Sequence, residues 1–574
     1  MKACCTNRAR TRADEPPSVV SPSVAARGQG LAGRLRAAWN QKGLLASAAA
    51  AVALGVAGCG GGGATADGSG TGGKSTSGTP ATGSADGSVE NAPVGEVLNL
   101  AMPGGPTSLD PAQFSSALEW FFDLPYDTLV VWGRDGKPHP GLATSWGYVG
   151  KGNRTFDVKL RPGVKFSDGT PLTAERVKAS IEYIAKNNAG AAGRWTNKTI
   201  RVTGPLSLRI TSKTPDPMID REIGQNLAGA QIINAKALQR PKQLGTTTAG
   251  AGPYVLEPSE TVANDHYTYT PNPHYWNKSA IHYKKVVVKV IPNVNSVLNA
   301  IKTGQVDAAP ADYTVAPAAQ SAGLQVKYTL LNFMGLNLMD RDGKMVPALG
   351  DVRVRQALNY AVDRETITRA LFGDFAKPTE QTVVPGQDGA FDGKVYSYDA
   401  AKAKQLLADA GYANGFTLPV LTSPYLGQSQ ITQAIAGDLE KIGVKLKFKT
   451  ISDTAQFFTE GQSGKYPAAA IAFGGLPIYT EGPLLFLPRK SGAVFNPLQS
   501  SDPELAALYN RAAAAEPAER AKLDQQIERR VVEQAWFLPV TLAPKFYFAR
   551  SSVKGLEPTS AQPLPSPVWL YPAT

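Results

Sequence analysis

A chain of 574 residues is longer than one hydrophobic core usually serves, so two or more lobes are expected. With 43% apolar residues and a mean hydropathy of -0.18, the composition excludes a protein that spans a membrane many times. Half of the formal net charge of +12 lies in residues 1–58, and the rest is too dilute to follow a nucleic-acid backbone. All three cysteines precede residue 60, which excludes disulfides and cysteine metal sites from the body.

Residues 1–58 are predicted to be a lipoprotein signal peptide. Basic residues precede an uncharged run at 43–58 that is rich in Ala, Leu and Val and too short to span a bilayer comfortably. The run ends in V-A-G-C at 56–59, which resembles the bacterial lipobox. We therefore expect Cys59 to be lipidated and to anchor the chain at the extracytoplasmic face of the cell membrane. The leader is long, which leaves open a translation start downstream of Met1.

Residues 59–94 are predicted to be a disordered tether. They are mostly Gly, Ser, Thr, Ala and Asp, a composition that buries too little apolar surface to offset the entropy of ordering the chain. The folded body is expected to start at about residue 95, where V-L-N-L-A at 97–101 predicts a first strand.

Alternating and helical patterns follow one another along the body. Residues 156–160 alternate as a half-buried strand, and a helix capped by Thr173 follows a turn. Its predicted buried face is Ala174, Val177, Ile181 and Ile184. The later elements are predicted as strands 286–291 and 444–448 and helices 295–303, 352–361, 363–372, 399–411 and 431–443. This alternation is typical of mixed α/β layers.

Six motifs stand out along the body: S-L-D-P at 108–111, G-L-A-T-S-W at 141–146, L-R-P-G-V-K-F-S-D-G-T-P-L-T-A-E at 160–175, G-A-G-P-Y at 250–254, N-P-H-Y-W at 272–276 and V-R-V-R-Q-A-L-N-Y-A-V-D-R at 352–364. They resemble motifs of the family 5 extracellular solute-binding proteins of ABC importers, the peptide- and nickel-binding class. The resemblance runs from about residue 98 to about residue 550.

The resemblance implies an α/β protein with a two-lobed, type II periplasmic binding protein-like fold in the large family 5 form. That form has an extra subdomain in lobe 1 and two interlobe crossovers, expected near 325–335 and 535–542. The expected parts are a lobe 1 core at 95–140, 255–330 and 536–574, the extra subdomain at 141–254, and lobe 2 at 331–535.

The resemblance also implies a function. We expect a monomer that captures a solute in the interlobe cleft and delivers it to ABC permease and ATPase subunits, with no catalytic residues, cofactor, metal or nucleic acid. An oligopeptide or modified peptide is the first expected solute, and an oligosaccharide, glycoside or other small metabolite is the alternative. A solute-sensing receptor and a secreted hydrolase remain open as other classes, although no G-x-S-x-G or H-E-x-x-H occurs.

The expected amine-binding residue of lobe 2 departs from the family pattern. Peptide-binding members carry a W-x-x-D-Y-like stretch whose aspartate pairs with the ligand's α-amino group. In this chain Phe473 stands near the tryptophan, and Leu476 occupies the approximate place of the aspartate. Either Glu481 substitutes from a shifted position, or the ligand lacks a free amino end.

Aromatic side chains are the other candidate contacts, because cleft walls favour them. The candidates are Trp120, Phe121, Phe473 and Tyr479. Core packing is the competing interpretation, and it is favoured for Trp120 and Phe121 because E-W-F-F can begin a helix buried on one side. The four histidines of the chain are too few and too scattered to favour nickel.

Overall fold

The computed structural model describes residues 92–573 except 226, 228, 475–476, 489–494 and 561. The predicted signal peptide, Cys59 and nearly all of the tether lie outside the described residues. Within the described part no helix is long and apolar enough to cross a membrane. Its α-helices are α2 (Trp120–Asp123), α3 (Ala174–Asn187), α4 (Ala189–Trp195), α5 (Ile219–Glu222), α6 (Val294–Lys302), α7 (Ala316–Ser321), α8 (Val352–Tyr360), α9 (Arg364–Phe372), α10 (Ala400–Asp409), α11 (Gln428–Glu440), α12 (Thr454–Gly461), α13 (Ile478–Leu485), α14 (Pro503–Ala514) and α15 (Pro517–Glu533).

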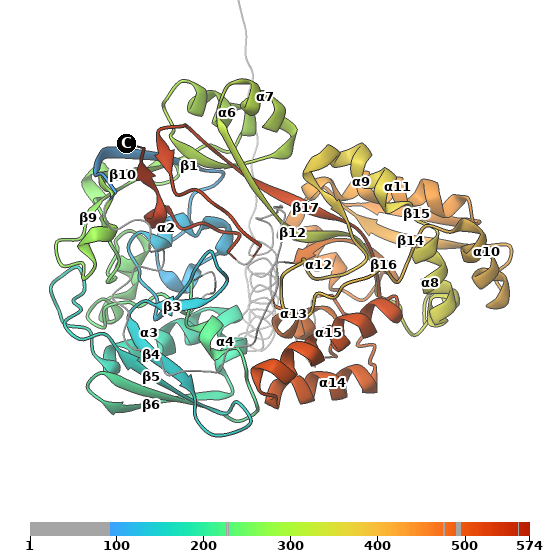
Figure 1. Cartoon of the computed structure of the whole chain (residues 1–574), viewed down its shortest axis with the longest axis horizontal. Helices are drawn as coiled ribbons and strands as arrows, with labels where there is room; N and C mark the ends of the chain where they lie inside the picture. The colour runs from blue at the N-terminus through green and yellow to red at the C-terminus, as the bar shows by residue number, and fades with distance from the viewer. Residues whose placement is uncertain are drawn as a thin grey trace, which may run out of the picture. The chain divides into compact units, whose positions relative to one another are not determined.

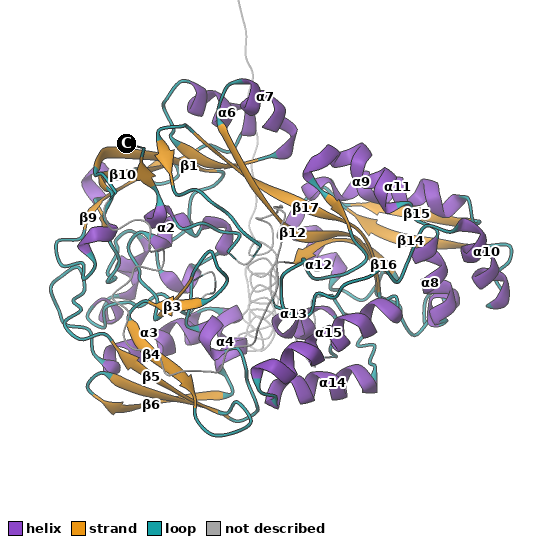
Figure 2. Ribbon diagram, in the orientation of Figure 1, coloured by secondary structure: helices purple, strands orange, loops and turns teal. Residues whose placement is uncertain are grey.

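One mixed sheet of eleven strands extends through both lobes (Figures 1 and 2). Its order is β15-β14-β16-β12-β17-β11-β1-β10-β9-β8, and β13 pairs with β17. The strands are β1 (Gly95–Met102), β8 (Tyr254–Leu256), β9 (His266–Pro271), β10 (Tyr283–Val290), β11 (Ala308–Ala311), β12 (Gln325–Leu338), β13 (Lys377–Pro378), β14 (Phe416–Thr422), β15 (Val444–Thr450), β16 (Ala468–Gly474) and β17 (Phe537–Ala549).

Two long antiparallel strands, β12 and β17, carry this sheet from one lobe into the other (Figure 1). The C-terminal half of β12 pairs with β16, whereas the C-terminal end of β17 pairs with β11. The register between β12 and β17 shifts between Leu330 and Asn332 and again between Met334 and Gly335. Such irregularities bend and twist a strand locally. The two predicted crossovers are thus confirmed, and each is a strand of the sheet.

Lobe 1 combines the β1 side of the sheet with a smaller antiparallel sheet, ordered β4-β5-β7-β6. As predicted, Thr173 caps α3 by accepting a hydrogen bond from the Arg176 amide, and the predicted apolar face of α3 is buried. Phe156 of β5 and Leu98 of β1 belong to one hydrophobic cluster, so the small sheet and the β1 side of the main sheet share one core. The other strands of lobe 1 are β2 (Val130–Trp132), β3 (Pro138–Pro140), β4 (Ala143–Tyr148), β5 (Thr155–Leu160), β6 (Lys198–Gly204), β7 (Ser207–Ser212), β18 (Val553–Lys554) and β19 (Tyr571–Pro572).

Lobe 2 is a layered α/β unit. Its parallel strands β14 and β15 are joined through α11, whose residues Ile431, Ile435 and Leu439 are buried as the sequence pattern predicts. Gly443 adopts a φ of 84°, a left-handed conformation that glycine accepts without a steric cost, and it starts the turn into β15. The exact division of the chain into lobes and subdomain stays a prediction.

Candidate functional site

Trp120 and Phe121 of α2 lie in the hydrophobic core of lobe 1, and both are fully buried. The Trp120 Nε1 donates a hydrogen bond to the Pro565 carbonyl at 2.9 Å, and its ring stacks on Tyr547. Phe121 packs edge-to-face on Tyr267, with ring centroids 4.9 Å apart. Core packing, the competing interpretation of E-W-F-F, therefore describes both residues in this structure. A contact between either residue and a solute stays a prediction.

Phe473, Tyr479 and Glu481 belong to lobe 2. Phe473, in β16, is fully buried and packs edge-to-face on Phe495. Glu481 of α13 is fully buried as well. Tyr479 is half-buried, its ring stacks on Tyr509 with centroids 4.3 Å apart, and its carbonyl accepts a hydrogen bond from the Tyr509 hydroxyl.

The four aromatic residues among the predicted contacts divide between two hydrophobic cores. Trp120 and Phe121 pack in the core of lobe 1, whereas Phe473 and Tyr479 share a cluster of lobe 2. Leu476, at the approximate place of the family's aspartate, lies outside the described residues.

The lobes touch where the small sheet of lobe 1 meets α14 and α15. Asn153 Nδ2 donates hydrogen bonds of 3.0 Å to both the Ala513 and Ala515 carbonyls at the end of α14. Arg520 of α15 donates to the Pro217 carbonyl at 3.4 Å. The two Asn153 bonds satisfy carbonyls that the C-terminal end of α14 leaves without an internal partner.

Charged side chains from both lobes meet beside these contacts. Arg221 of α5 interacts electrostatically with Asp388 and Arg520 of lobe 2. Arg520 Nε also lies 3.8 Å from the Asp524 carboxylate. Burial, with Asp388 adding to it, raises the pKa of Asp524 to about 7 against the opposing effect of Arg520. We call this surface the interlobe face, defined by Asp216, Asp220, Arg221, Asp388, Tyr479, Arg520 and Asp524.

Tyr479 is the predicted contact residue that lies on the interlobe face. Burial raises the pKa of its hydroxyl, and Asp216 of lobe 1 raises it further. The phenol therefore stays protonated at neutral pH and can donate a hydrogen bond. The face as a whole offers cationic, anionic and neutral donor groups, which suits a solute that carries both signs of charge.

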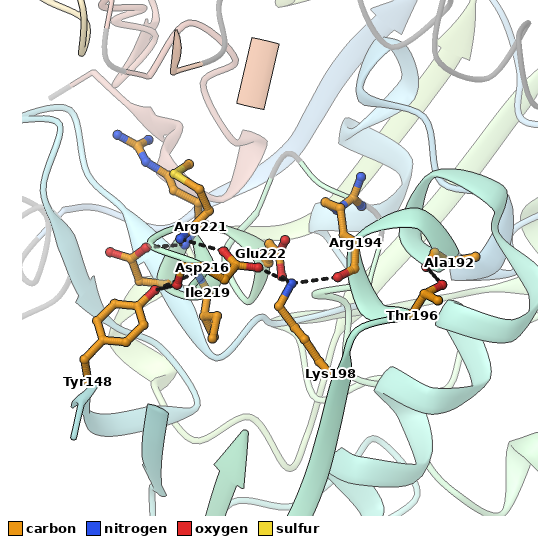
Figure 3. Close-up of polar contacts among 11 residues, drawn as sticks. Tyr148, Ala192, Arg194, Thr196, Lys198, Asp216, Ile219, Arg221 and Glu222 are labelled. Atoms are coloured by element: carbon orange, nitrogen blue, oxygen red, sulfur yellow. Dashed lines mark hydrogen bonds and ion pairs between the residues drawn. The ribbon is translucent and has the colours of Figure 1, made fainter. Parts of the chain in front are cut away.

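Lys198 of β6 fixes the segment that supplies the lobe 1 side of this face. Its side chain is 2% exposed, and its Nζ lies 2.5 Å from Asp216 Oδ2 and 2.8 Å from Glu222 Oε2 (Figure 3). The same Nζ donates to the Arg194 carbonyl at 2.6 Å. Asp220 and Arg221 lie between the two anchored carboxylates in the sequence, so Lys198 holds the segment that carries them and pairs directly with Asp216 of the interlobe face.

A row of three carboxyl side chains, one fully and two partly buried, lies next to Trp120 at intervals of four residues. Glu119 is 1% exposed, and neither of its carboxylate oxygens has a hydrogen-bond partner among the residues that the structure describes. Burial raises the pKa of Glu119 to about 8, although Lys545 opposes the shift. Burial also raises the pKa of Asp123 and of Asp127 to about 7.

Sequence reasoning missed both groups of charged residues. The interlobe face joins segments that are up to about 300 residues apart, and no local pattern indicates such a meeting. The row of carboxyl groups is visible as a pattern in the sequence, because Glu119, Asp123 and Asp127 recur at helical spacing inside an otherwise apolar run. In the described part of the chain no three His, Cys, Asp or Glu side chains gather as a metal site requires.

Residues 137–492 match the family described as bacterial extracellular solute-binding proteins, family 5 Middle. The chain is 28% identical over 363 residues to the glutathione-binding protein GsiB of Pectobacterium atrosepticum, a match that covers 61% of this chain and 68% of that relative. It is 27% identical over 312 residues to the protein of the same name from Escherichia coli K12, covering 53% of this chain and 59% of that relative.

A solved structure shares the fold. The ABC transporter-associated periplasmic binding protein DppA from Helicobacter pylori, in complex with the peptide STSA, superposes with a TM-score of 0.69 at 21% identity. The superposition covers 84% of this chain and 99% of that one. The predicted two-lobed fold is therefore confirmed.

Proposed function

Because this chain belongs to the bacterial extracellular solute-binding proteins, family 5, we propose that it captures its solute at the interlobe face and delivers it to an ABC permease. The observation that supports this site is the electrostatic interaction of two lobe 1 residues with lobe 2: Arg221 interacts with Asp388 and Arg520, and Asp216 interacts with Tyr479. A solute held there contacts both lobes only when they are together, so binding favours the form in which they meet. We expect the connecting strands to flex at the register shifts of β12, where the pairing is irregular.

The solute that we propose is an oligopeptide or a modified peptide. Two relatives are named for binding glutathione, and the Helicobacter protein holds a peptide. Arg221 and Arg520 suit a free carboxylate, and Asp220, Asp388 and Asp524 suit an amine, so the face supplies both partners of a zwitterionic chain end. Amine recognition then needs no aspartate at the place of Leu476.

Native mass spectrometry tests this proposal directly. The full chain with Cys59→Ser, purified from its own host, should carry a bound molecule whose fragments are amino acids. Arg221→Ala should lose that molecule, because it removes a cation from the face, whereas the exposed, distant Lys404→Ala should keep it. A co-purified sugar would refute the peptide assignment and favour the oligosaccharide alternative.

We propose further that Cys59 is lipidated and holds the protein on the extracytoplasmic face of the membrane. The change Cys59→Ser should give exported protein that carries no lipid and separates from the membrane fraction, because the thiol is the lipid acceptor. Cys5→Ser is the matched control and should leave the fractionation unchanged. Full membrane retention of the Cys59→Ser protein would refute the anchor.

A further inference from the structure

A cavity of about 110 Å³ lies inside lobe 1. Its walls come from the end of α2, from β2 and β3, from residues 275–282 and from residues 566–569 near the C-terminus. No residue between 331 and 535 lines it, and neither does any member of the interlobe face. It is therefore separate from the proposed solute site.

The wall of this cavity carries carboxyl groups and no opposing cation. Asp123 and Asp127 are its two carboxyl groups, and no Lys or Arg among the described residues lines it. The remaining titratable base in its wall is His282, and burial lowers the pKa of that imidazole, so it stays neutral at pH 7. Glu119 lies four residues before Asp123 and is almost fully buried, and burial raises its pKa to about 8, so it is mostly protonated at pH 7.

The two carboxyl groups, Asp123 and Asp127, differ in the hydrogen-bond donors and cations that the protein places beside them. Asp127 accepts hydrogen bonds from Trp276 Nε1 at 2.8 Å and from the Tyr275 hydroxyl at 3.4 Å, and Arg161 acts on it as a nearby cation. Asp123 interacts with the Ser566 hydroxyl. Its Oδ2 is buried and has no hydrogen-bond partner among the described residues. Burying a carboxylate oxygen without a hydrogen-bond donor costs free energy. A cationic donor from outside the chain would satisfy this oxygen.

Aromatic rings form much of the remaining wall. Tyr126, Tyr275, Trp276 and Trp569 all line the cavity. Electron-rich ring faces attract cations, and a carboxylate next to them fixes where the charge rests. The chain already uses two of these rings in that way outside the cavity, because the Arg161 guanidinium lies 3.9 Å from the Trp276 ring and that of Arg134 lies 5.5 Å from Trp569.

We propose that this cavity, the Asp123 pocket, binds the ammonium group of a small aliphatic primary amine. A primary ammonium carries three N–H donors, one of which meets Asp123 Oδ2 while the alkyl part contacts the aromatic wall. A quaternary ammonium has no such donor and leaves the carboxylate oxygen unsatisfied. The size of the cavity limits the ligand to a short alkyl chain.

Isothermal titration of the full Cys59→Ser chain with ethylammonium chloride tests the pocket. At constant ionic strength ethylammonium should bind saturably with one equivalent, whereas neutral ethanol of nearly the same shape should not. Equal responses to ethylammonium and ethanol would overturn the proposal, because the carboxylate would then contribute nothing to recognition.

Three variants locate the binding. Asp123→Asn should weaken ethylammonium at least about tenfold, the loss expected when a charge-assisted hydrogen bond is removed. Ala280→Leu keeps the carboxylate, narrows the cavity and should weaken binding as well, so it decides the matter if Asp123→Asn does not fold. Glu182→Gln removes an exposed carboxylate of α3 and should bind as the wild type does. Wild-type affinity in Asp123→Asn or in Ala280→Leu would contradict the assignment.

Discussion

Replacing Lys198 by methionine should lower the free energy of unfolding by about 3–5 kcal/mol, the usual effect of removing one partner of a buried ion pair. Asp216 and Glu222 would keep their places with no ammonium group between them. Methionine fills a similar volume, so the loss would reflect charge rather than a cavity. Urea denaturation followed by circular dichroism measures the change.

The matched control for this prediction is Lys178→Met. Lys178 pairs with Glu182 on the surface of α3, and the two side chains are 31% and 53% exposed. Surface pairs of this kind contribute about 0.2–1 kcal/mol. Equal destabilisation by the two lysine variants would mean that Lys198 does not hold the segment before α5. Adding Glu222→Gln to Lys198→Met should restore part of the stability, because one uncompensated charge is then removed.

The protein should also be more stable at pH 5 than at pH 8. Burial raises the pKa of several carboxyl groups to about 7 and that of Glu119 to about 8. The groups at about 7 are Asp123, Asp127, Glu222, Asp524 and Glu528. Between pH 5 and pH 8 the folded state holds protons that the unfolded chain has released, so the free energy of unfolding falls as the pH rises. We expect a melting temperature at least about 3 °C higher at pH 5.

Other titrating groups oppose this fall in stability only weakly between pH 5 and pH 8. Carboxylates with lowered pKa values, such as Asp157 beside Arg209, lose their contribution only in stronger acid. Burial lowers the pKa of His282, so the contribution of this imidazole to stability decreases as the pH is lowered below about 6.5. It is a single group, whereas six carboxyl groups with raised pKa values act in the opposite direction. Glu119→Gln should raise the melting temperature at pH 8 and leave it nearly unchanged at pH 5. A melting temperature that rises steadily from pH 5 to pH 8 would refute this account.

The sequence predicted the fold well wherever local rules decide the structure. Thr173 caps α3, Asp399 caps α10, and Gly443 turns the chain into β15, each as the residue type and its spacing indicate. The crossover strands β12 and β17 were predicted from the family resemblance and lie within a few residues of the expected positions. Caps and periodicity are local properties, so one sequence is enough to reveal them.

The site was predicted less completely, for a physical reason. An aromatic residue is compatible with a cleft wall and with a core, and its burial depends on which segments pack over it. Trp120, Phe121 and Phe473 are core residues in this structure, whereas Tyr479 lies where the lobes meet. The partners of Arg221 come from α15 and from the Asp388 loop, and only the folded chain brings them within reach.

Small-angle X-ray scattering of the full Cys59→Ser chain, with and without its co-purified solute, tests most directly the claim that the solute is held between the lobes. A solute that contacts both lobes favours the form in which they meet, so the radius of gyration should fall when the solute binds and rise again when it is removed. The Arg221→Ala protein should keep the larger radius at a solute concentration that compacts the wild type. An unchanged radius in wild-type protein shown to be fully occupied would contradict the account.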